Sequence, residues 1–273
     1  MEFTLTAYKK LLISLQTQGF LFYTFEEFVK TSTINAIVLR HDVDLLPENS
    51  LKTAQIEHSL GIRGTYYFRA VPVSWDEEII RRIHEMGHEV GYHYENIDFI
   101  RTKNKEQRTS NKDSIGNLID LAYEDFCENL ERLRKLVPVS TICMHGSPKS
   151  KFDNKAIWEK YNYKELGIIG EPYYDMDFSK AFYLTDTGRR WDGYKVSVRD
   201  KMPVHQDRWN QQGLSFHTTN QIITAANEGK LPDKIMITVH PQRWTNNPDL
   251  WAKEFLMQKM KNVVKYVLIN MKK

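Results

Sequence analysis

The sequence predicts an α/β fold built around a parallel sheet, and two observations support this prediction. Strand-like and helix-like stretches alternate along the chain, as they do in successive βα units. The first strong strand, residues 37–44, opens with a continuous apolar run, Ile37-Val38-Leu39, which is typical of a strand buried on both faces. This run ends in ionisable side chains, and in such folds ligands bind at the carboxyl ends of the strands.

The first half of the chain supplies four predicted strands. Pro47 and Gly61 mark the ends of the first helix between them, because proline favours the first helical position and glycine the position after the last. The predicted strands are residues 37–44, 64–68, 89–93 and 139–144, and the predicted helices are residues 47–61, 75–86 and 118–136. The polar, lysine-rich residues 101–114 predict an exposed loop or the edge of a helix.

The second half continues the alternation with weaker signals. Short apolar stretches indicate strands, and longer periodic stretches indicate helices, the last of them amphipathic. The expected strands are residues 167–169, 181–184 and 234–239, and the expected helices are residues 219–228 and 250–271. The pattern therefore predicts βα units up to the C-terminal helix.

Composition limits the classes of function. The 273 residues are 41% hydrophobic and 27% charged, as in a globular protein, and the net charge of +3 is too balanced to indicate nucleic acid or a membrane surface as a partner. No linker marks a boundary, so we expect one domain over residues 1–273, with a core at about 36–244 and terminal helices packed on it. No window reaches the length of a membrane span and residues 1–22 lack signal-peptide features, so we expect a cytoplasmic protein.

The two cysteines, Cys127 and Cys143, predict neither a metal site nor a disulfide framework. Their spacing does not match that of metal ligands, and two cysteines in a chain of this length do not suggest a disulfide scaffold. We expect both to be buried free thiols.

Polar side chains follow the predicted strands at the points where they end. These residues are Asp42 and Asp44 after the first strand, Arg69 after the second, His93 at the end of the third, His145 after the fourth and His240 after the last. The carboxyl ends of parallel strands lie on one side of a sheet and converge in a barrel. The sequence therefore predicts a metal site or an acid–base site at this edge.

Each residue taken singly also has a structural interpretation. Asp42 and, more readily, Asp44 are suited to cap the following helix. His93 lies in a tyrosine-rich strand and His145 in a turn sequence, where hydrogen bonding alone accounts for a histidine. His240 precedes proline, which holds its backbone extended and orients its side chain or ends the strand. Their joint occurrence at successive strand ends favours the functional interpretation.

The motifs resemble those of polysaccharide deacetylases. Asp42-Val43-Asp44, residues 87–93, the strand before His145 and residues 237–240 occur in the order found in carbohydrate esterase family four, the nodulation-protein deacetylase homology domain. The chain is similar to an Arg-His-Asp-Val-Asp branch of that family over about residues 37–244. The resemblance implies an irregular (β/α) barrel of about seven parallel strands. It also implies a hydrolase of non-peptide carbon–nitrogen bonds that removes acetyl groups from N-acetylated sugars or polysaccharide precursors with a divalent metal.

The resemblance also implies roles for four residues. Asp42 corresponds to the catalytic base and Asp44 to a metal ligand. His93 corresponds to the first metal-binding histidine of the second motif, and His240 to the general acid. These roles predict that water attacks the acetamide carbon as Asp42 takes its proton, and that His240 protonates the departing amine.

The third metal ligand is left open by the sequence. The family places a second histidine four residues after the first, where this chain has Ile97. His145 is the best replacement, and Asp98 and Glu95 are the alternatives. One aspartate and two histidines suit zinc or another first-row divalent ion, with water in an open position.

Three further residues are predicted to bind substrate. Arg69 either orients Asp42 or contacts the substrate. Arg190 and Trp191 lie in residues 186–193, whose flexible, cationic and aromatic groups suit a sugar-binding loop, the alternative being a solvated turn with one packed tryptophan. Trp244, shortly after His240, belongs either to the same rim or to the core.

Two other functions stay open at the level of sequence. One is an amidohydrolase acting on a non-sugar carbon–nitrogen bond on the same scaffold, which the missing second histidine suggests. The other is a non-catalytic module in surface-polysaccharide assembly. The expected partner is a small-molecule or saccharide substrate, with no nucleic acid, and the sequence does not specify an oligomeric state.

Overall fold

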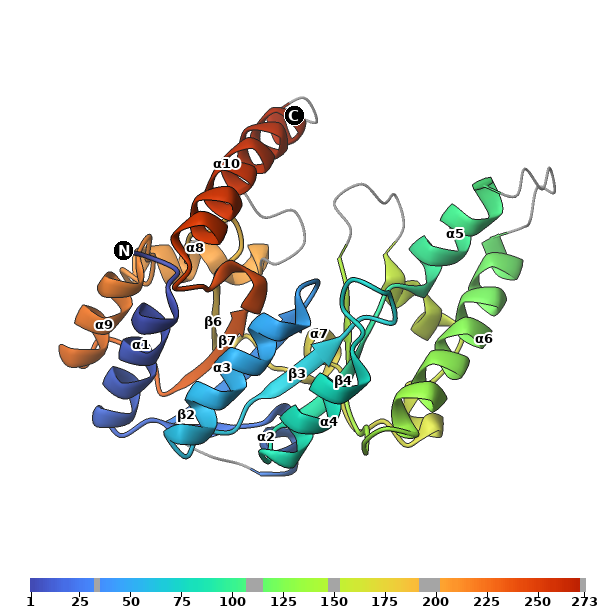
Figure 1. Cartoon of the computed structure of the whole chain (residues 1–273), viewed down its shortest axis with the longest axis horizontal. Coiled ribbons are helices and arrows are strands. Elements are labelled where there is room, and N and C mark those ends of the chain that lie inside the picture. Colours follow the sequence, from blue (N-terminus) through green and yellow to red (C-terminus); the bar gives the residue numbers. More distant parts are fainter. Residues whose placement is uncertain (32–34, 107–114, 147–152, 192–201, 271–273) are drawn as a thin grey trace.

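Seven parallel strands form one sheet in the computed structural model, which describes residues 1–31, 35–106, 115–146, 153–191 and 202–270 (Figure 1). The strands are β1 Leu21–Tyr23, β2 Ala36–Val43, β3 Thr65–Phe68, β4 Glu89–Tyr94, β5 Ile142–Met144, β6 Phe182–Thr185 and β7 Lys234–Val239. Their order is β5-β4-β3-β2-β7-β6, with β1 paired to the first half of β2. The predicted α/β fold with about seven parallel strands is confirmed, and in the described residues no pairing joins β5 to β6.

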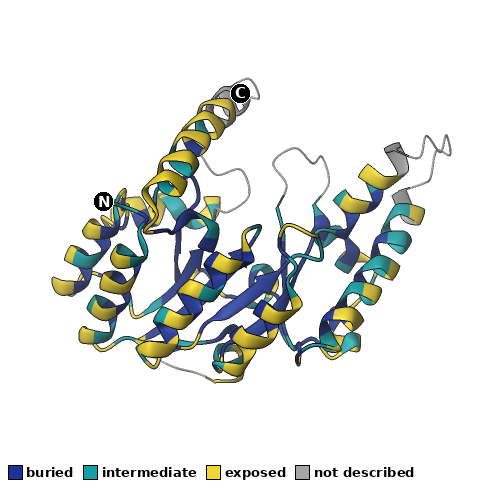
Figure 2. Ribbon diagram, viewed as in Figure 1, coloured by how far each residue is buried: buried dark blue, intermediate teal, exposed yellow. Residues whose placement is uncertain are grey.

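Helices cover the sheet and follow the strands as the alternation predicts. They are α1 Leu5–Thr17, α2 Phe25–Lys30, α3 Pro47–Ser59, α4 Glu77–Glu85, α5 Asn96–Glu106, α6 Ile115–Arg134, α7 Pro172–Asp175, α8 Pro203–Gln211, α9 Thr219–Asn227 and α10 Pro248–Asn270. One apolar cluster packs α1 and α9 against β2, β6 and β7, and a second packs α4 and α6 against β3, β4 and β5. Figure 2 shows the strands buried and the outer sides of these helices exposed.

One expectation from the sequence is corrected. Residues 167–169 form no strand: a 3₁₀ turn, Tyr163–Leu166, ends there at Gly167 in a left-handed conformation, and only Gly170 bridges to Thr141. For the polar interval 101–114, the helix alternative holds in the first part, which belongs to α5, while residues 107–114 lie outside the described ones. No helix in the described part of the chain is both long enough and apolar enough to cross a membrane.

The central strand β2 presents its side chains alternately to the two faces of the sheet. All eight residues of β2 are buried, including Arg40, His41 and Asp42. Arg40 and Asp42 share one face, and His41 points to the other, where α1 and α3 pack. Polar groups at such depth need partners on both faces, because an unpaired buried charge is costly.

On the helix-covered face, the carboxylate of Glu57 on α3 supplies these partners. Its Oε1 accepts hydrogen bonds from the hydroxyls of Tyr8 (2.6 Å) and Tyr66 (2.8 Å), and lies 2.9 Å from His41 Nε2. The His41 ring stacks on Tyr66 with 3.9 Å between centroids. Burial by itself raises the pKa of Glu57, but His41, His88 and the Tyr8 hydrogen bond outweigh it and hold this pKa below its usual value. One ionised carboxylate thus joins α1, α3, β2 and β3.

On the opposite face, Gly91 in β4 leaves room for Tyr67. A Cβ atom at position 91 would lie 2.4 Å from the Tyr67 ring and 2.8 Å from the Thr141 carbonyl oxygen, closer than real contacts allow. The absent side chain lets the Tyr67 ring lie against the neighbouring strand, with the Arg40 guanidinium 6.0 Å from its centroid. A glycine is therefore required for packing directly beneath the carboxyl edge of the sheet.

We expect Glu57→Gln to lower the free energy of unfolding by about 3 kcal/mol at neutral pH, because it removes the charge that a buried network is built around. A carboxyl group whose pKa is lower in the folded than in the unfolded protein stabilises the fold at pH values above the unfolded-state pKa. This stabilisation is lost as the pH falls through the folded-state pKa. The difference between wild type and variant should therefore shrink as the pH falls below 4.5, the unperturbed value for glutamate. Urea unfolding across this pH range tests this, with the exposed Glu85→Gln as control. A difference that does not change with pH would contradict it.

Candidate metal and catalytic site

The carboxyl ends of β2, β4, β5 and β7 bring five of the predicted residues together. These are Asp42, Asp44, His93, His145 and His240. Each of the three histidines has a ring nitrogen 3.5–3.9 Å from a carboxylate oxygen of Asp42 or Asp44. Asp44 and His145 are partly exposed, with 21% and 18% of their side-chain surfaces accessible, whereas the other three are buried. The cluster therefore has a solvent-facing rim and a dry floor.

Arg40 holds Asp42 at the floor of the site. These two residues alternate along β2, so their side chains share a face. Arg40 Nε donates to Asp42 Oδ1 (2.8 Å) and Nη2 donates to Oδ2 (2.6 Å), a bidentate pair. Burial raises the pKa of Asp42, but the Arg40 charge outweighs it and lowers the pKa to about 2. The carboxylate is therefore ionised and fixed in orientation at neutral pH.

Arg69 supports the site but does not orient Asp42, so that alternative was wrong. Its Nε donates to Glu95 Oε1 (2.8 Å) and its Nη1 donates to the backbone oxygen of Asp44 (2.9 Å). Arg69 thus holds both the chain at Asp44 and the carboxylate of Glu95. Substrate binding by Arg69 stays a prediction.

Three side chains form a group suited to a metal ion, which we call the ligand group: Asp44, His93 and His145. Asp44 Oδ1 lies 3.7 Å from His93 Nε2 and 3.5 Å from His145 Nε2. His93 Nδ1 lies 2.9 Å from the Cys143 carbonyl oxygen, which only accepts hydrogen bonds, so Nδ1 carries the proton. His145 Nδ1 lies 2.9 Å from a carboxylate oxygen of Glu95, an ion-pair distance at which the negative charge favours the proton on Nδ1. Both Nε2 lone pairs are therefore free to bind a metal.

The spacing and the hydrogen bonding of the ligand group fit a divalent ion. Asp44 Oδ1 is buried and has no hydrogen-bond partner among the described residues. Ligands held 2.0–2.1 Å from a tetrahedral zinc lie about 3.4 Å apart, close to the separations of Asp44 Oδ1 from the two imidazole nitrogens. Burial raises the pKa of Asp44, but the three neighbouring histidines outweigh it and hold the pKa well below its usual value. An ionised oxygen of Asp44 thus lies close to the Nε2 atoms of both imidazoles.

The structure separates the three alternatives for the third ligand. Glu95 contacts Nδ1 of His145, the nitrogen turned away from Asp44, and is placed to orient this imidazole. Asp98 accepts a hydrogen bond from Asn154 Nδ2 (3.2 Å) and lies 3.8 Å from Arg101. Ile97, at the position of the family's second histidine, is buried in an apolar cluster with Ile100. Of the three candidates, His145 is the one whose free nitrogen faces Asp44.

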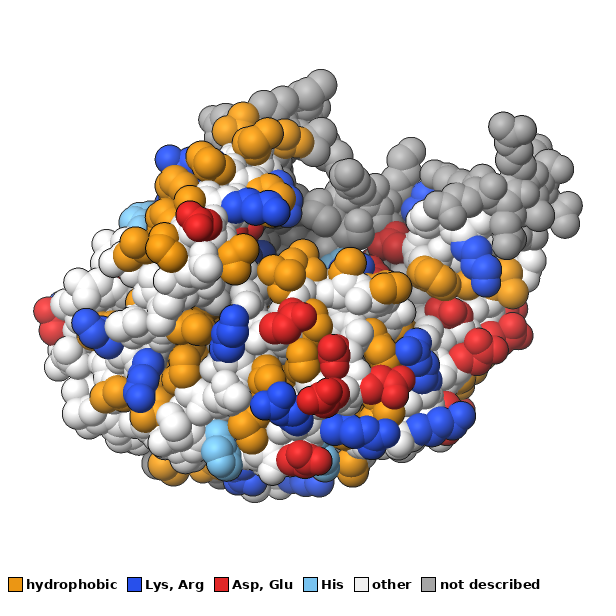
Figure 3. All heavy atoms as spheres, viewed as in Figure 1, with side chains coloured by type: hydrophobic (Ala, Val, Ile, Leu, Met, Phe, Trp, Pro, Cys, Tyr) orange, Lys and Arg blue, Asp and Glu red, His pale blue; other side chains and the backbone are white. Residues whose placement is uncertain are grey.

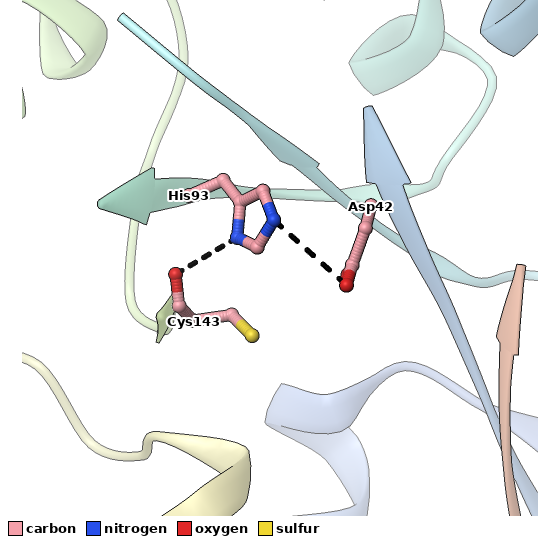
Figure 4. Close-up of side chains that lie close together, drawn as sticks. All are labelled: Asp42, His93 and Cys143. Carbon is pink, nitrogen blue, oxygen red and sulfur yellow. Dashed lines mark hydrogen bonds and ion pairs between the residues drawn. The ribbon is translucent and has the colours of Figure 1, made fainter. Parts of the chain in front are cut away.

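A second group of possible ligands shares His93 and consists of Asp42, His93 and Cys143 (Figure 4). Both oxygens of Asp42 are already bonded to Arg40, whose positive charge opposes a further cation there. Figure 4 also shows His93 Nδ1 directed to the Cys143 carbonyl rather than to its sulfur. The ligand group around Asp44 fits an ion better. Neither cysteine is in a disulfide, and Cys127 is partly exposed, whereas Cys143 is buried as expected.

Asp186 orients His240 on the other side of Asp44. Asp186 Oδ1 lies 2.6 Å from His240 Nδ1, and its Oδ2 accepts hydrogen bonds from the His240 backbone nitrogen (3.0 Å) and from Trp244 Nε1 (2.7 Å). His240 Nε2 lies 3.9 Å from Asp44 Oδ2. Burial and the Arg243 charge lower the pKa of His240, but Asp186 and Asp44 outweigh them and raise it above its usual value.

Sequence reasoning had not identified Arg40 or Asp186 as partners of the site. A signal was present for each: Arg40 lies two residues before Asp42 in a strand, and Asp186 directly follows β6 at the same edge of the sheet. Trp244, for which two interpretations were open, is fully buried in the core.

The substrate-binding prediction for Trp191 is wrong. The indole is 2% exposed, with ring centroids 6.4 Å from Phe3 and 5.9 Å from Trp244, and its Nε1 donates to Thr219 Oγ1 (3.0 Å). Arg190 Nη2 lies 2.8 Å from His217 Nδ1, and its role in substrate binding stays a prediction. The last two residues of the proposed sugar-binding loop, 192 and 193, lie outside the described part of the chain.

The helix-capping alternative for Asp44 is also excluded. The residue that caps α3 is Leu46, in a left-handed conformation and with no side-chain hydrogen bond to the helix. Asp44 instead accepts a hydrogen bond from Gln242 Nε2 (3.1 Å) on Oδ2 and leaves Oδ1 to the ligand group.

Comparisons with known proteins give distant structural similarities. No family model and no curated protein sequence matches the chain significantly. Among solved structures, a mutant of a CE4-family pseudoenzyme with restored enzymatic activity is 11% identical (TM-score 0.39), and the match covers 82% of this chain but 62% of that one. A peptidoglycan N-acetylglucosamine deacetylase is 16% identical, with 82% of each chain covered (TM-score 0.35). Bacillus subtilis PdaA, a family 4 carbohydrate esterase, is 15% identical, with 92% and 83% covered (TM-score 0.34). No function follows from similarities at this level.

We expect Glu95→Gln to weaken the binding of zinc by roughly 10- to 100-fold, the usual cost of losing a residue that supports a metal ligand. His145→Ala should weaken it further. The alanine removes a ligand nitrogen, whereas the glutamine leaves the ligand but weakens the bond that orients it. Isothermal titration calorimetry with zinc measures both effects. His84→Ala, on the exposed side of α4, is the matched control and should bind as wild type does. Equal affinity in His145→Ala and wild type would rule out His145 as a ligand.

Proposed function

We propose that this protein is a metal-dependent deacetylase that hydrolyses the acetamide group of an N-acetylated sugar or polysaccharide precursor. One observation carries the proposal: an oriented carboxylate and an oriented imidazole lie on two sides of the ligand group. Asp42 Oδ2 lies 3.8 Å from His93 Nε2, and His240 Nε2 lies 3.9 Å from Asp44 Oδ2. The order of the motifs along the chain, which resembles that of polysaccharide deacetylases, supports the choice of substrate.

Asp42 is suited to accept the proton of an attacking water. Its carboxylate is ionised at neutral pH, because the Arg40 pair holds its pKa at about 2. The same pair fixes its plane, so that a water bound beside it is oriented toward the rim where Asp44 and His145 are exposed. Proton transfer to a positioned carboxylate is a general-base step, and it makes the water oxygen the nucleophile toward the acetyl carbon.

His240 is suited to donate a proton to the departing nitrogen. Asp186 accepts from its Nδ1, which leaves Nε2 as the atom that faces the site. The raised pKa of His240 increases the fraction of imidazolium near neutral pH. When the carbon–nitrogen bond breaks, transfer of this proton releases the sugar as a neutral amine and leaves acetate as the other product.

Asp44, His93 and His145 are the residues that would hold the metal ion. A divalent ion bound there supplies a Lewis acid for the carbonyl oxygen and lowers the pKa of water toward about 7. Cys143 and Glu95 hold the two imidazoles in the tautomer that such binding requires. The buried floor formed by Asp42 and His93 excludes bulk water, which strengthens the electrostatic interactions among these groups.

A substrate panel tests the proposed function. Zinc-loaded protein is incubated with N-acetylated mono- and oligosaccharides and, in parallel, with cyclic and linear non-sugar amides, and released acetate and free amine are measured. We expect acetate and amine in equal amounts from the acetylated sugars, and no product after removal of the metal with a chelator. Hydrolysis confined to the non-sugar amides would contradict the proposed substrate, and no hydrolysis of any amide would contradict the proposed reaction.

We expect His240→Ala to reduce kcat by about 10²- to 10⁴-fold while leaving zinc content and the fold unchanged, because loss of a general acid slows the chemical step without removing a ligand. Asp186→Asn should reduce kcat in the same direction, since the amide no longer selects the productive tautomer of His240. Steady-state kinetics on the zinc-loaded variants measures this, with His84→Ala as control. Wild-type turnover by His240→Ala would show that another group donates the proton.

A further inference from the structure

The C-terminal helix α10 turns two aromatic and two polar side chains toward the protein. Trp251, Phe255, Gln258 and Asn262 follow one another at helical spacing and form its inner face. Gln258 is 4% exposed and donates to Asn262 Oδ1 (2.7 Å), and Asn262 Nδ2 donates to the Gly188 backbone oxygen (2.9 Å). Trp251 Nε1 donates to the backbone oxygen of residue 2 (2.7 Å). The helix is therefore attached to the body largely through hydrogen bonds.

Arg189 fixes the first turns of α10. Its guanidinium lies 4.7 Å from the ring centroid of Trp251 and 5.6 Å from that of Phe255, a stacked cation–π arrangement. Arg189 follows shortly after β6 and Asp186, so the helix is anchored at the edge of the sheet that carries the candidate site. Figure 1 shows α10 projecting from the body at this edge.

The outer face of α10 is apolar, which is the reverse of an ordinary amphipathic helix. Its exposed residues, with their exposed fractions, are Leu256 (61%), Met257 (42%), Met260 (71%), Val263 (64%) and Val264 (57%). Their spacing places them on one continuous stripe on the side opposite to Gln258 and Asn262. Figure 2 shows this side of α10 exposed, and Figure 3 shows hydrophobic side chains gathered along it. A contiguous exposed stripe of this kind indicates an interaction surface.

Lysines accompany this apolar stripe. Lys253, Lys259 and Lys261 are all exposed, and at 100° per residue Lys259 and Lys261 fall on either side of the stripe. A second copy of the chain docked on this face would bring like charges together, which opposes self-association. An anionic surface would instead be attracted by the same lysines while the apolar stripe enters the lipid.

We propose that α10 docks this protein on an anionic lipid surface, with the apolar stripe between the lipid headgroups and the lysines beside it. The overall net charge of +3 does not reveal this surface, because the relevant charges are local to one helix. The helix lies on the surface and does not span the membrane, in line with the absence of a spanning helix from the described residues.

Vesicle co-sedimentation tests the proposal. We expect the full-length protein to bind vesicles of phosphatidylcholine mixed with phosphatidylglycerol more tightly than vesicles of phosphatidylcholine alone, and to lose this preference at high salt. Met260→Glu combined with Val264→Glu should weaken binding by about tenfold or more, because two residues that enter the lipid become charged. Val204→Glu on α8 is the matched control, since Val204 is 88% exposed outside the stripe, and it should bind as wild type does.

Three results would overturn the proposal: no binding to anionic vesicles, equal binding to both kinds of vesicle, or equal binding by the double variant and wild type. Sedimentation velocity without lipid tests the alternative occupant, a second copy of the chain. A dimer that the double variant dissociates, together with no vesicle binding, would assign the stripe to self-association. Far-ultraviolet circular dichroism and thermal unfolding of the double variant show that its fold is retained, because the substituted side chains are exposed.

Discussion

The ion pair between Arg40 and Asp42 is the interaction on which the rest of the site depends. Both side chains are buried on the central strand β2, where a lone carboxylate would be neutralised by protonation. The two hydrogen bonds from the charged Arg40 outweigh the cost of burial and keep Asp42 ionised. Tyr67 and Tyr173 lie against the guanidinium, so Arg40 cannot move away without disrupting the inner face of the sheet. The position of Asp42 is therefore set by the core, before any ligand binds.

The same principle recurs around the site: a buried partner orients each group that would act. Asp186 holds His240, and Glu95 holds His145, in each case through Nδ1, so that Nε2 faces the centre. These pairs come from distant parts of the sequence and lie close together because the carboxyl ends of parallel strands meet at one edge of the sheet. The charges around them distinguish Asp42, in β2, from Asp44, which follows it. Asp42 is paired with an arginine, whereas the pKa of Asp44 is lowered by the neighbouring histidines, and its Oδ1 has no hydrogen-bond partner among the described residues.

Much of the fold and the location of the site could be predicted from the sequence. The strand predicted at residues 37–44 is β2, Ala36–Val43, and the polar groups at strand ends do meet, because parallel strands align their carboxyl ends. The residues that orient them could not be predicted, since pairings such as Asp186 with His240 depend on side-chain geometry across β6 and β7. The strand predicted at residues 167–169 and the substrate-binding role predicted for Trp191 were wrong for a related reason. A short apolar or aromatic stretch of sequence does not show what its side chains pack against. The C-terminal helix was expected to be amphipathic, and only the structure shows that its apolar side faces outward.

The central claim is that Asp44, His93 and His145 hold a divalent ion, and anomalous diffraction at the zinc absorption edge tests it most directly. Crystals grown with zinc would locate the ion without reference to activity. We expect one strong peak within bonding distance of Asp44 and both histidine Nε2 atoms. A peak bounded by Asp42, His93 and Cys143, or no peak among these residues, would contradict it.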